Sequence, residues 1–238
     1  MAGDRWATFD CYGTLIDWNG GIRAELARVF GDDRADEVLH RYHELEPELE
    51  ADGKLSYREV LTEAMRRLDA PPGEEDALAQ ALPSWRPFPE VPAALMGARG
   101  RGWKLAILSN TDRDYIEASL AQLGVPFEVA IVASEIGSYK PALRHWQAFE
   151  ERVGRPPDVH VAASLFHDVA PANELGLPSV WINRLGEKPG PSPTREPRKR
   201  PPLASTPTRP GQPTQSPRTS TVTGAAPGTA KRMLTLET

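Results

Sequence analysis

The chain has few of the features that mark secreted, membrane or nucleic-acid-binding proteins. It contains a single cysteine, Cys11, so it cannot form an internal disulfide. It has no apolar run near the roughly 20 residues that a spanning helix needs, and its N-terminus does not resemble a signal peptide. Its formal net charge of -5 argues against a basic surface for nucleic acid or an anionic membrane. We therefore expect a cytoplasmic protein whose partners are small molecules.

The sequence does contain a regular alternation of short apolar runs and amphipathic segments. With 39% hydrophobic residues, it can form one substantial core. Glycines at the ends of two amphipathic segments, Gly124 and Gly154, suit left-handed helix caps. The pattern predicts an α/β fold, a Rossmann-like parallel sheet with helices on both faces, which binds ligands beyond the carboxyl ends of its strands. The predicted strands cover residues 6–9, 104–108, 129–132, 159–163 and 178–182.

The helical and strand patterns divide the chain into a core and an insertion. Residues 18–88 contain helical segments without strands, including a capping-box signal from Ser56 to Glu59, and predict a helical cap. Residues 1–17 and 89–186 are expected to form the core. Apolar residues on the cap helices would serve either a homodimer contact or a cover over the substrate.

The C-terminal residues 187–238 have a different composition. Pro, Ser, Thr, Arg and Gly dominate most of this stretch, and few large apolar residues are present to offset the entropy of ordering. We therefore expect a disordered tail.

A carboxylate and a glycine follow the first predicted strand, in the segment Asp-Cys-Tyr-Gly-Thr-Leu at residues 10–15. Gly13 lets the backbone turn sharply, so that its amides lie near the Asp10 carboxylate. An aspartate followed by a glycine is also an ordinary turn signal. By itself the segment is compatible with a nucleophile or with a turn.

Three further polar segments follow later predicted strands, and together with residues 10–15 we call them the four stations. The three segments are Ser109-Asn110, Lys140-Pro141 and His167-Asp168. Each alone suits a helix cap or a surface turn. Because the carboxyl ends of parallel strands meet at one edge of the sheet, the four stations together predict one site.

The four stations resemble the four motifs of the haloacid dehalogenase superfamily of hydrolases, over about residues 5–185. The family's Rossmann-like core with a helical cap after the first strand agrees with the layout above. The resemblance implies that Asp10 is the nucleophile, that Thr14 and Ser109 orient charge around it, that Lys140 is its cationic partner and that Asp168 closes the site.

The residue two positions after Asp10 bears on the reaction. Phosphatases of the superfamily have a second aspartate there and use magnesium, whereas this chain has Tyr12. A tyrosine with a pKa near 10 is a poor acid for an alkoxide leaving group, while a halide leaves without a proton. The segment is thus similar to the 2-haloacid dehalogenase branch. The resemblance implies hydrolysis of (S)-2-haloacids, or similar small organic acids, to 2-hydroxyacids through an aspartyl ester, without a metal or other cofactor.

Two alternatives stay open at this stage. One is a magnesium-dependent phosphatase or another hydrolase of the same superfamily. The other is a catalytically silent binding or regulatory protein with the same fold.

The branch also places a cap arginine over the nucleophile, and Arg41 is the candidate here. The alternative is that Arg41, beside Glu44 and Glu46 on the same helix, simply pairs at the surface. Tyr12 and Asn110 complete the predicted substrate-binding residues.

The sequence departs from the branch at several positions of the predicted site. Ala163 and Leu165 stand where the branch has a serine and an asparagine that position water, and Trp146 replaces a tyrosine. His167 is a candidate for the missing polar function, because an imidazole titrates near neutrality.

Overall fold

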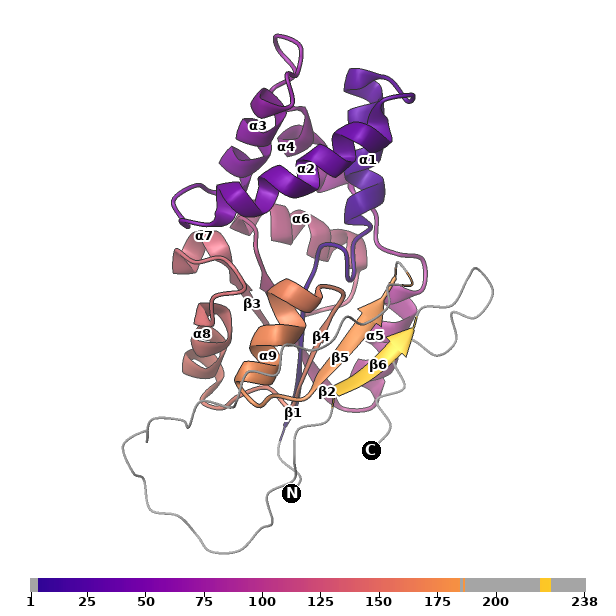
Figure 1. The fold of residues 1–238 in the computed structure, drawn as a ribbon. Coiled ribbons are helices and arrows are strands. Elements are labelled where there is room, and N and C mark those ends of the chain that lie inside the picture. The colour runs from indigo at the N-terminus through magenta and orange to yellow at the C-terminus, as the bar shows by residue number, and fades with distance from the viewer. Residues whose placement is uncertain (1–3, 185, 187–218, 224–238) are drawn as a thin grey trace, which may run out of the picture.

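The computed structural model describes residues 4–184, Gly186 and Thr219–Thr223. Its six parallel strands form one sheet in the order β3-β2-β1-β4-β5-β6 (Figure 1). The chain proceeds from β1 to one side of the sheet and then to the other, which opens a crevice at the carboxyl ends of β1 and β4. The five predicted strands are confirmed, each within one residue at either end. The strands are β1 Arg5–Phe9, β2 Trp103–Ser109, β3 Val129–Val132, β4 Val159–Ala162, β5 Ser179–Asn183 and β6 Thr219–Thr223.

Helices pack on both faces of the sheet, as predicted. Residues that alternate along a strand point to opposite faces. Phe9 and Ile107 belong to the larger apolar cluster, which also contains residues of α5 (Val91–Gly100) and α6 (Arg113–Leu123). The neighbouring positions face a second cluster with Trp146 and Phe149 of α8. The remaining elements of the core are α7 Ala133–Ile136, α8 Arg144–Val153, a π-helical turn Leu165–Val169 and α9 Ala170–Glu174. Gly124 and Gly154 end α6 and α8 in the left-handed conformation.

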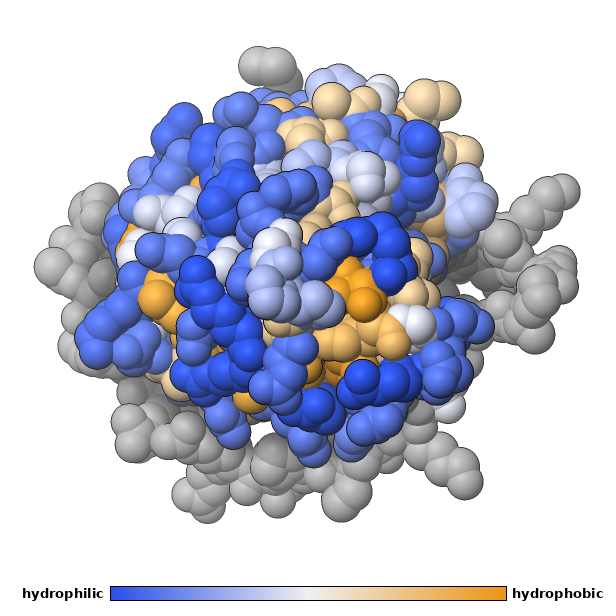
Figure 2. Space-filling view, turned by 90° about the horizontal axis from the view of Figure 1, so that it is seen from above, coloured by the Kyte–Doolittle hydropathy of each residue, from blue (hydrophilic) through white to orange (hydrophobic). Residues whose placement is uncertain are grey.

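A group of helices lies over the carboxyl ends of the strands (Figure 1). We call this group, residues 18–88, the cap. Seen from above, the outer surface of the molecule is mainly hydrophilic (Figure 2), whereas apolar side chains such as Ile22, Leu26 and Leu61 are buried. Amphipathic helices therefore close the top of the crevice. The cap elements are α1 Trp18–Phe30, α2 Ala35–Glu50, α3 Tyr57–Arg67, α4 Ala77–Ala81 and a 3-10 turn Leu82–Ser84.

The start of α3 is tied to the core. The capping box predicted here is present, because Ser56 and Glu59 bond each other's backbone amides. The buried carboxylate of Asp112 also accepts the amides of Tyr57 and Arg58, at 3.0 and 2.9 Å. A carboxylate at a helix N-terminus is favourable to the helix dipole, so this contact fixes the cap on the core.

The prediction of a disordered tail does not hold for Thr219–Thr223. These residues form β6, which pairs in parallel with β5 from Ser179 to Asn183. Beyond β4 the edge of β5 offers unpaired backbone groups, and the sequence Thr-Ser-Thr-Val-Thr is rich in β-branched residues that favour a strand. The rest of the predicted tail lies outside the described residues. No helix in the described part of the chain has the length and apolar character needed to cross a membrane.

Candidate active site

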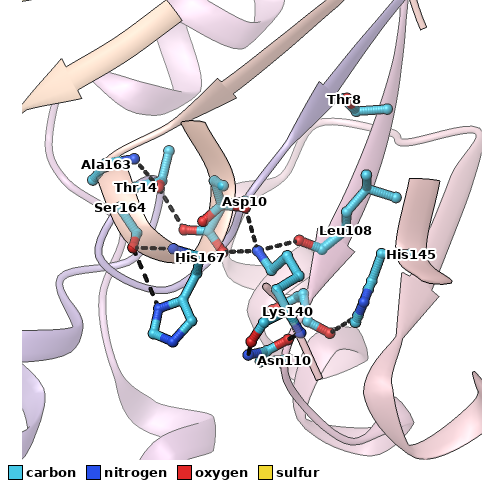
Figure 3. Close-up of polar contacts among 12 residues, drawn as sticks. Thr8, Asp10, Thr14, Leu108, Asn110, Lys140, His145, Ala163, Ser164 and His167 are labelled. Carbon is cyan, nitrogen blue, oxygen red and sulfur yellow. Dashed lines mark hydrogen bonds and ion pairs between the residues drawn. The ribbon is translucent and has the colours of Figure 1, made fainter. Parts of the chain in front are cut away.

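Asp10 lies directly beyond the end of β1, beneath the cap. It is 7% exposed, and its Oδ2 accepts a hydrogen bond from Thr14 Oγ1 at 2.6 Å. Gly13 has a φ of 81°, a conformation that favours glycine, and this turn brings Thr14 back to Asp10. Thr14 Oγ1 in turn accepts from the amide of Ala163, at the end of β4 (Figure 3). The two central strands thus hold one carboxylate oxygen in place.

Lys140 holds the other oxygen of Asp10. Its Nζ donates to Asp10 Oδ1 at 2.9 Å, to Leu108 O at 2.9 Å and to Asp168 Oδ1 at 2.6 Å (Figure 3). Asn110 fixes the backbone of Lys140 from both sides, because its Oδ1 accepts from Lys140 N and its Nδ2 donates to Lys140 O. The sequence predicted that these residues meet, and the structure brings them together.

A histidine that the sequence analysis missed supports Asp168. His160 of β4 is fully buried, and its Nε2 lies 3.0 Å from Asp168 Oδ1, while its Nδ1 lies 2.9 Å from Thr8 Oγ1. An ionised carboxylate only accepts, so Nε2 donates to Asp168, and Thr8 Oγ1 also donates to Val159 O at 3.3 Å. The only signal for this residue was a histidine inside a strand with both faces buried, where a polar side chain needs partners.

The pKa values of the three central groups follow from burial and mutual attraction. Burial raises the pKa of Asp10, although the Lys140 ammonium and the Thr14 hydroxyl oppose this effect. Burial would also raise the pKa of Asp168, but Lys140 and His160 lower it below its usual value. Burial would lower the pKa of Lys140, yet the two carboxylates raise it above its usual value. The lysine is therefore charged, and the site is a buried ion triad.

A cavity of about 450 Å³ opens above Asp10, between the core and the cap. This volume suits a small organic molecule. The core contributes Asp10, Ser109 and Lys140 to its lining, and α2 contributes His43, Glu46, Pro47 and Glu50. The site residues predicted from the sequence line this cavity, except Thr14 and Arg41. Thr14 bonds Asp10 without lining the cavity.

Tyr12 forms an apolar part of the cavity wall. Its ring stacks on that of Tyr57 with centroids 6.3 Å apart, and its hydroxyl is bonded to Ser119 Oγ at 3.0 Å. Burial raises the pKa of Tyr12 well above its usual value. The phenol is therefore held by the core helix α6 and keeps its proton.

The ammonium of Lys140 supplies the positive charge between Asp10 and Asp168, because it contacts the Oδ1 atoms of both carboxylates. Within residues 4–184, Gly186 and 219–223, no group of three or more His, Cys, Asp or Glu side chains is arranged to hold a metal.

Arg41 is not brought to Asp10, contrary to the expectation from the resemblance. Its guanidinium donates to Arg67 O at 3.3 Å and lies 4.0 Å from Asp69, outside the cavity lining. The face of α2 that reaches the cavity carries His43, Glu46 and Glu50, and two residues along a helix turn the side chain by about 200°. Arg41 thus falls on the opposite face. The contact with Asp69 agrees with the alternative that Arg41 pairs at the surface, although the partner is neither Glu44 nor Glu46.

Two carboxyls that the sequence analysis did not single out, Glu46 and Glu50, line the cavity from α2. Burial raises the pKa of Glu46 to about 7, against the effect of two phenol donors, and raises that of Glu50 well above its usual value. An i, i+4 pair of glutamates on a helix with one buried face was the available signal, but such residues are normally placed at the surface.

The structure shows where His167, Trp146 and the motif residue Ser109 lie relative to the cavity. His167 lines the cavity, its amide donates to Ser164 Oγ at 3.0 Å, and burial lowers its pKa, so it is a neutral imidazole (Figure 3). Trp146 is buried against His160, away from the cavity. Ser109 lines the cavity, and its Oγ is buried without a hydrogen-bond partner in the part of the chain that the structure describes.

Comparisons with known proteins agree with this geometry. Residues 5–163 match the model of the haloacid dehalogenase-like hydrolase family. The chain is 31% identical to haloacetate dehalogenase H-2 of Moraxella sp. (strain B) over 191 residues, which cover 75% of this chain and 85% of that protein. It is 28% identical to (S)-2-haloacid dehalogenase 4A of Burkholderia cepacia over 197 residues, 78% of this chain and 85% of that protein.

A solved structure has the same fold. The L-2-haloacid dehalogenase of Xanthobacter autotrophicus with chloropropionic acid covalently bound superposes with a TM-score of 0.67, at 23% identity, over 77% of this chain and 79% of that one. The chain belongs to the haloacid dehalogenase-like hydrolase family.

Proposed function

We propose that the protein hydrolyses carbon–halogen bonds in small organic compounds whose halogen is on the carbon next to a carbonyl group. The relatives named for (S)-2-haloacids and haloacetate act on compounds of this class. The observation that carries the proposal is the Asp10 carboxylate at the floor of the cavity, held by Thr14 and Lys140, with the protonated phenol of Tyr12 where a second carboxylate would be needed for phosphate transfer.

In the first step, an oxygen of Asp10 attacks the carbon that bears the halogen, with inversion, and forms an aspartyl ester. Thr14 and Lys140 hold the carboxylate in position for attack. The halide leaves as a weak base, so no acid is required. Asn110 fixes Lys140, and Tyr12 forms the apolar wall beside the substrate.

In the second step, water attacks the carbonyl carbon of the Asp10 ester. Asp168, ionised through Lys140 and His160, orients or activates this water. Backbone amides of Cys11 and Tyr12 stabilise the oxyanion. Ser109 contributes a hydroxyl without a partner, and His167 lies at the cavity as a second neutral polar group.

A single turnover in heavy-oxygen water tests the covalent route. With enzyme in excess over 2-chloropropionate or 2-chloropropionamide, the first turnover places solvent oxygen in Asp10, which peptide mass measurement locates. Asp10→Asn should release no halide, and a chelator should leave the wild-type rate unchanged. Label found only in the product would reject the ester intermediate. Phosphate-ester hydrolysis that a chelator abolishes would instead support the magnesium-dependent alternative.

A further inference from the structure

The cap wall of the cavity carries two carboxyls where a carboxylate substrate would need a cation. Glu46 and Glu50 are 9% and 6% exposed and lie one turn apart on α2. Glu46 Oε1 accepts from the phenols of Tyr42 and Tyr57, at 3.0 and 2.8 Å. Glu50 Oε2 accepts from Asn110 Nδ2 at 3.0 Å. These donors are all neutral, so they orient the carboxyls without cancelling a negative charge.

The cations that line the cavity are already engaged. Lys140 donates to three acceptors. Arg184 donates to Thr14 O through Nε and Nη2, pairs with Glu90 at 2.9 Å and lies over the ring of Phe88. Among the cavity residues that the structure describes, no other lysine or arginine is present.

The histidines of the cavity add no charge. Burial lowers the pKa of His43 and of His167, so both are neutral near pH 7. On the floor, Asp10 and Asp168 already share the ammonium of Lys140, so the floor offers no free positive charge to a substrate anion. A substrate carboxylate would add another anion in a site where burial strengthens repulsion.

An uncharged amide avoids this repulsion and matches the polar groups of the cavity. Its NH₂ can donate to a glutamate oxygen on the cap wall. Its carbonyl oxygen can accept from Ser109 Oγ, which is buried, lines the cavity and has no partner within the described residues. The amide carbonyl also activates the neighbouring carbon–halogen bond toward substitution, as a carboxylate does.

From this juxtaposition we propose that the cavity selects uncharged 2-haloamides over 2-haloacids, with Glu46 and Glu50 as the residues that set the preference. The inference rests on the proposed function of Asp10. Asp10 forms a bond to the α-carbon, and the carbon–halogen bond breaks with its electron pair on the halide. Water then cleaves the ester at the Asp10 carbonyl carbon, which restores the carboxylate and gives a 2-hydroxyamide and one proton.

The test compares halide release from 2-chloropropionamide and 2-chloropropionate by the full chain at about pH 8. We expect kcat/KM for the amide to exceed that for the acid by about tenfold or more, as for one added like charge in a partly buried site. Glu46→Gln should lower the amide-to-acid ratio several-fold by raising the rate with the acid, and Glu50→Gln should lower it less, because burial favours the neutral form of Glu50. Glu48→Gln, an exposed glutamate on the same helix, should leave the ratio unchanged.

Binding of the unreactive analogues propionamide and propionate, measured by ligand-observed NMR, separates the two proposals. If halide is released but the acid is preferred, or if the ratio is the same in all variants, the amide selection is overturned while the dehalogenase proposal stands. If neither compound releases halide but propionamide binds and propionate does not, the selection stands and the reaction assigned to Asp10 fails. Equal binding without turnover rejects both.

Discussion

The floor and the cap wall of the cavity differ in how their charges are balanced. On the floor, Asp10 and Asp168 share the ammonium of Lys140, with distances of 2.9 and 2.6 Å. On the cap wall, Glu46 and Glu50 receive hydrogen bonds only from phenol and amide donors within the described residues. Lys140 thus opposes the effect of burial on the pKa of both floor carboxyls, and that of Asp168 falls below its usual value, whereas the pKa values of Glu46 and Glu50 are raised.

In the proposed function, the floor carries out the reaction and the cap wall determines which substrate is used. An oriented aspartate carboxylate is what a nucleophilic attack requires, and Thr14 and Lys140, which hold Asp10, belong to loops of the core. The cap carboxyls do not bond Asp10 directly, and Glu50 reaches it only through Asn110 and Lys140, whereas both glutamates face the cavity. Variants of the floor should therefore lower turnover of every substrate, and variants of the cap wall should change which substrate is used.

The largest effect is expected for Lys140→Met. Removal of the ammonium leaves two buried carboxyls without their shared cation, which should cost roughly 3–5 kcal/mol of the free energy of unfolding and at least about 10³-fold in kcat. Urea denaturation and halide release measure the two effects. The loss of stability should shrink as the pH falls toward about 4, because protonation removes the unpaired charges. A variant as stable as the wild type at neutral pH would contradict the ion triad.

A smaller effect is expected for His160→Phe, which keeps a ring against Trp146 but removes the donor to Asp168. The cost should be about 1–3 kcal/mol, and Thr8→Val, which removes only the outer hydroxyl, should cost less. In a double-mutant cycle the two changes should couple, because they belong to one hydrogen-bonded chain. Additive losses would show that the chain Thr8-His160-Asp168 does not form.

The same variant has a pH signature. The pKa of Asp168 is lowered in the folded protein, so its contribution to stability is present above the unfolded value of about 3.9 and is lost as the pH falls below it. His160→Phe removes part of this lowering. Its stability should therefore fall less steeply than that of the wild type in acid, and an unchanged slope would assign the lowered pKa to Lys140 alone.

The sequence predicted the floor better than the cap wall, for a physical reason. Strand ends in a parallel sheet converge, so the positions of Asp10, Ser109, Lys140 and Asp168 follow from the order of apolar runs. Which side of α2 faces the cavity depends on how the helix is rotated in the packed cap. Apolar periodicity predicts that Tyr42 is buried, but it does not predict that the glutamates on the following turns are buried as well. Arg41 was therefore misplaced, and the cap glutamates were missed.

The buried polar residues of the strands were missed for another reason. His160 lies in the run Val-His-Val-Ala, which a strand pattern explains without any partner. Only the arrangement of β1 beside β4 brings Thr8 to one side of its ring and Asp168 to the other. Such long-range pairs are not encoded in local periodicity.

The pH dependence of kcat/KM for the acid and the amide tests the charge of the cap wall. The pKa of Glu46 is raised to about 7, so the side chain is neutral below this value and repels an anion above it. kcat/KM for 2-chloropropionate should fall by about tenfold as the pH rises through 7, while that for 2-chloropropionamide should change less. The phenols of Tyr42 and Tyr57 keep their protons throughout, because burial raises their pKa values well above 10. The step should disappear in Glu46→Gln, and a step that persists would have another origin.

The smallest effect is expected for Arg41→Gln, and this variant tests the arrangement of the cap itself. Arg41 contacts the carbonyl of Arg67 and the exposed Asp69 on the outer side of α2, and such surface contacts contribute little. The value of kcat/KM should therefore stay within about twofold of the wild type, and the free energy of unfolding within about 1 kcal/mol. The matched control is Arg66→Gln on the neighbouring helix α3, where Arg66 pairs with Glu63 of the same helix. A loss of more than tenfold with Arg41→Gln alone would mean that α2 turns to bring an arginine over Asp10 when substrate is bound. In that case the carboxyl pair would leave the cavity, and the assignment of substrate selection to the cap wall would fail.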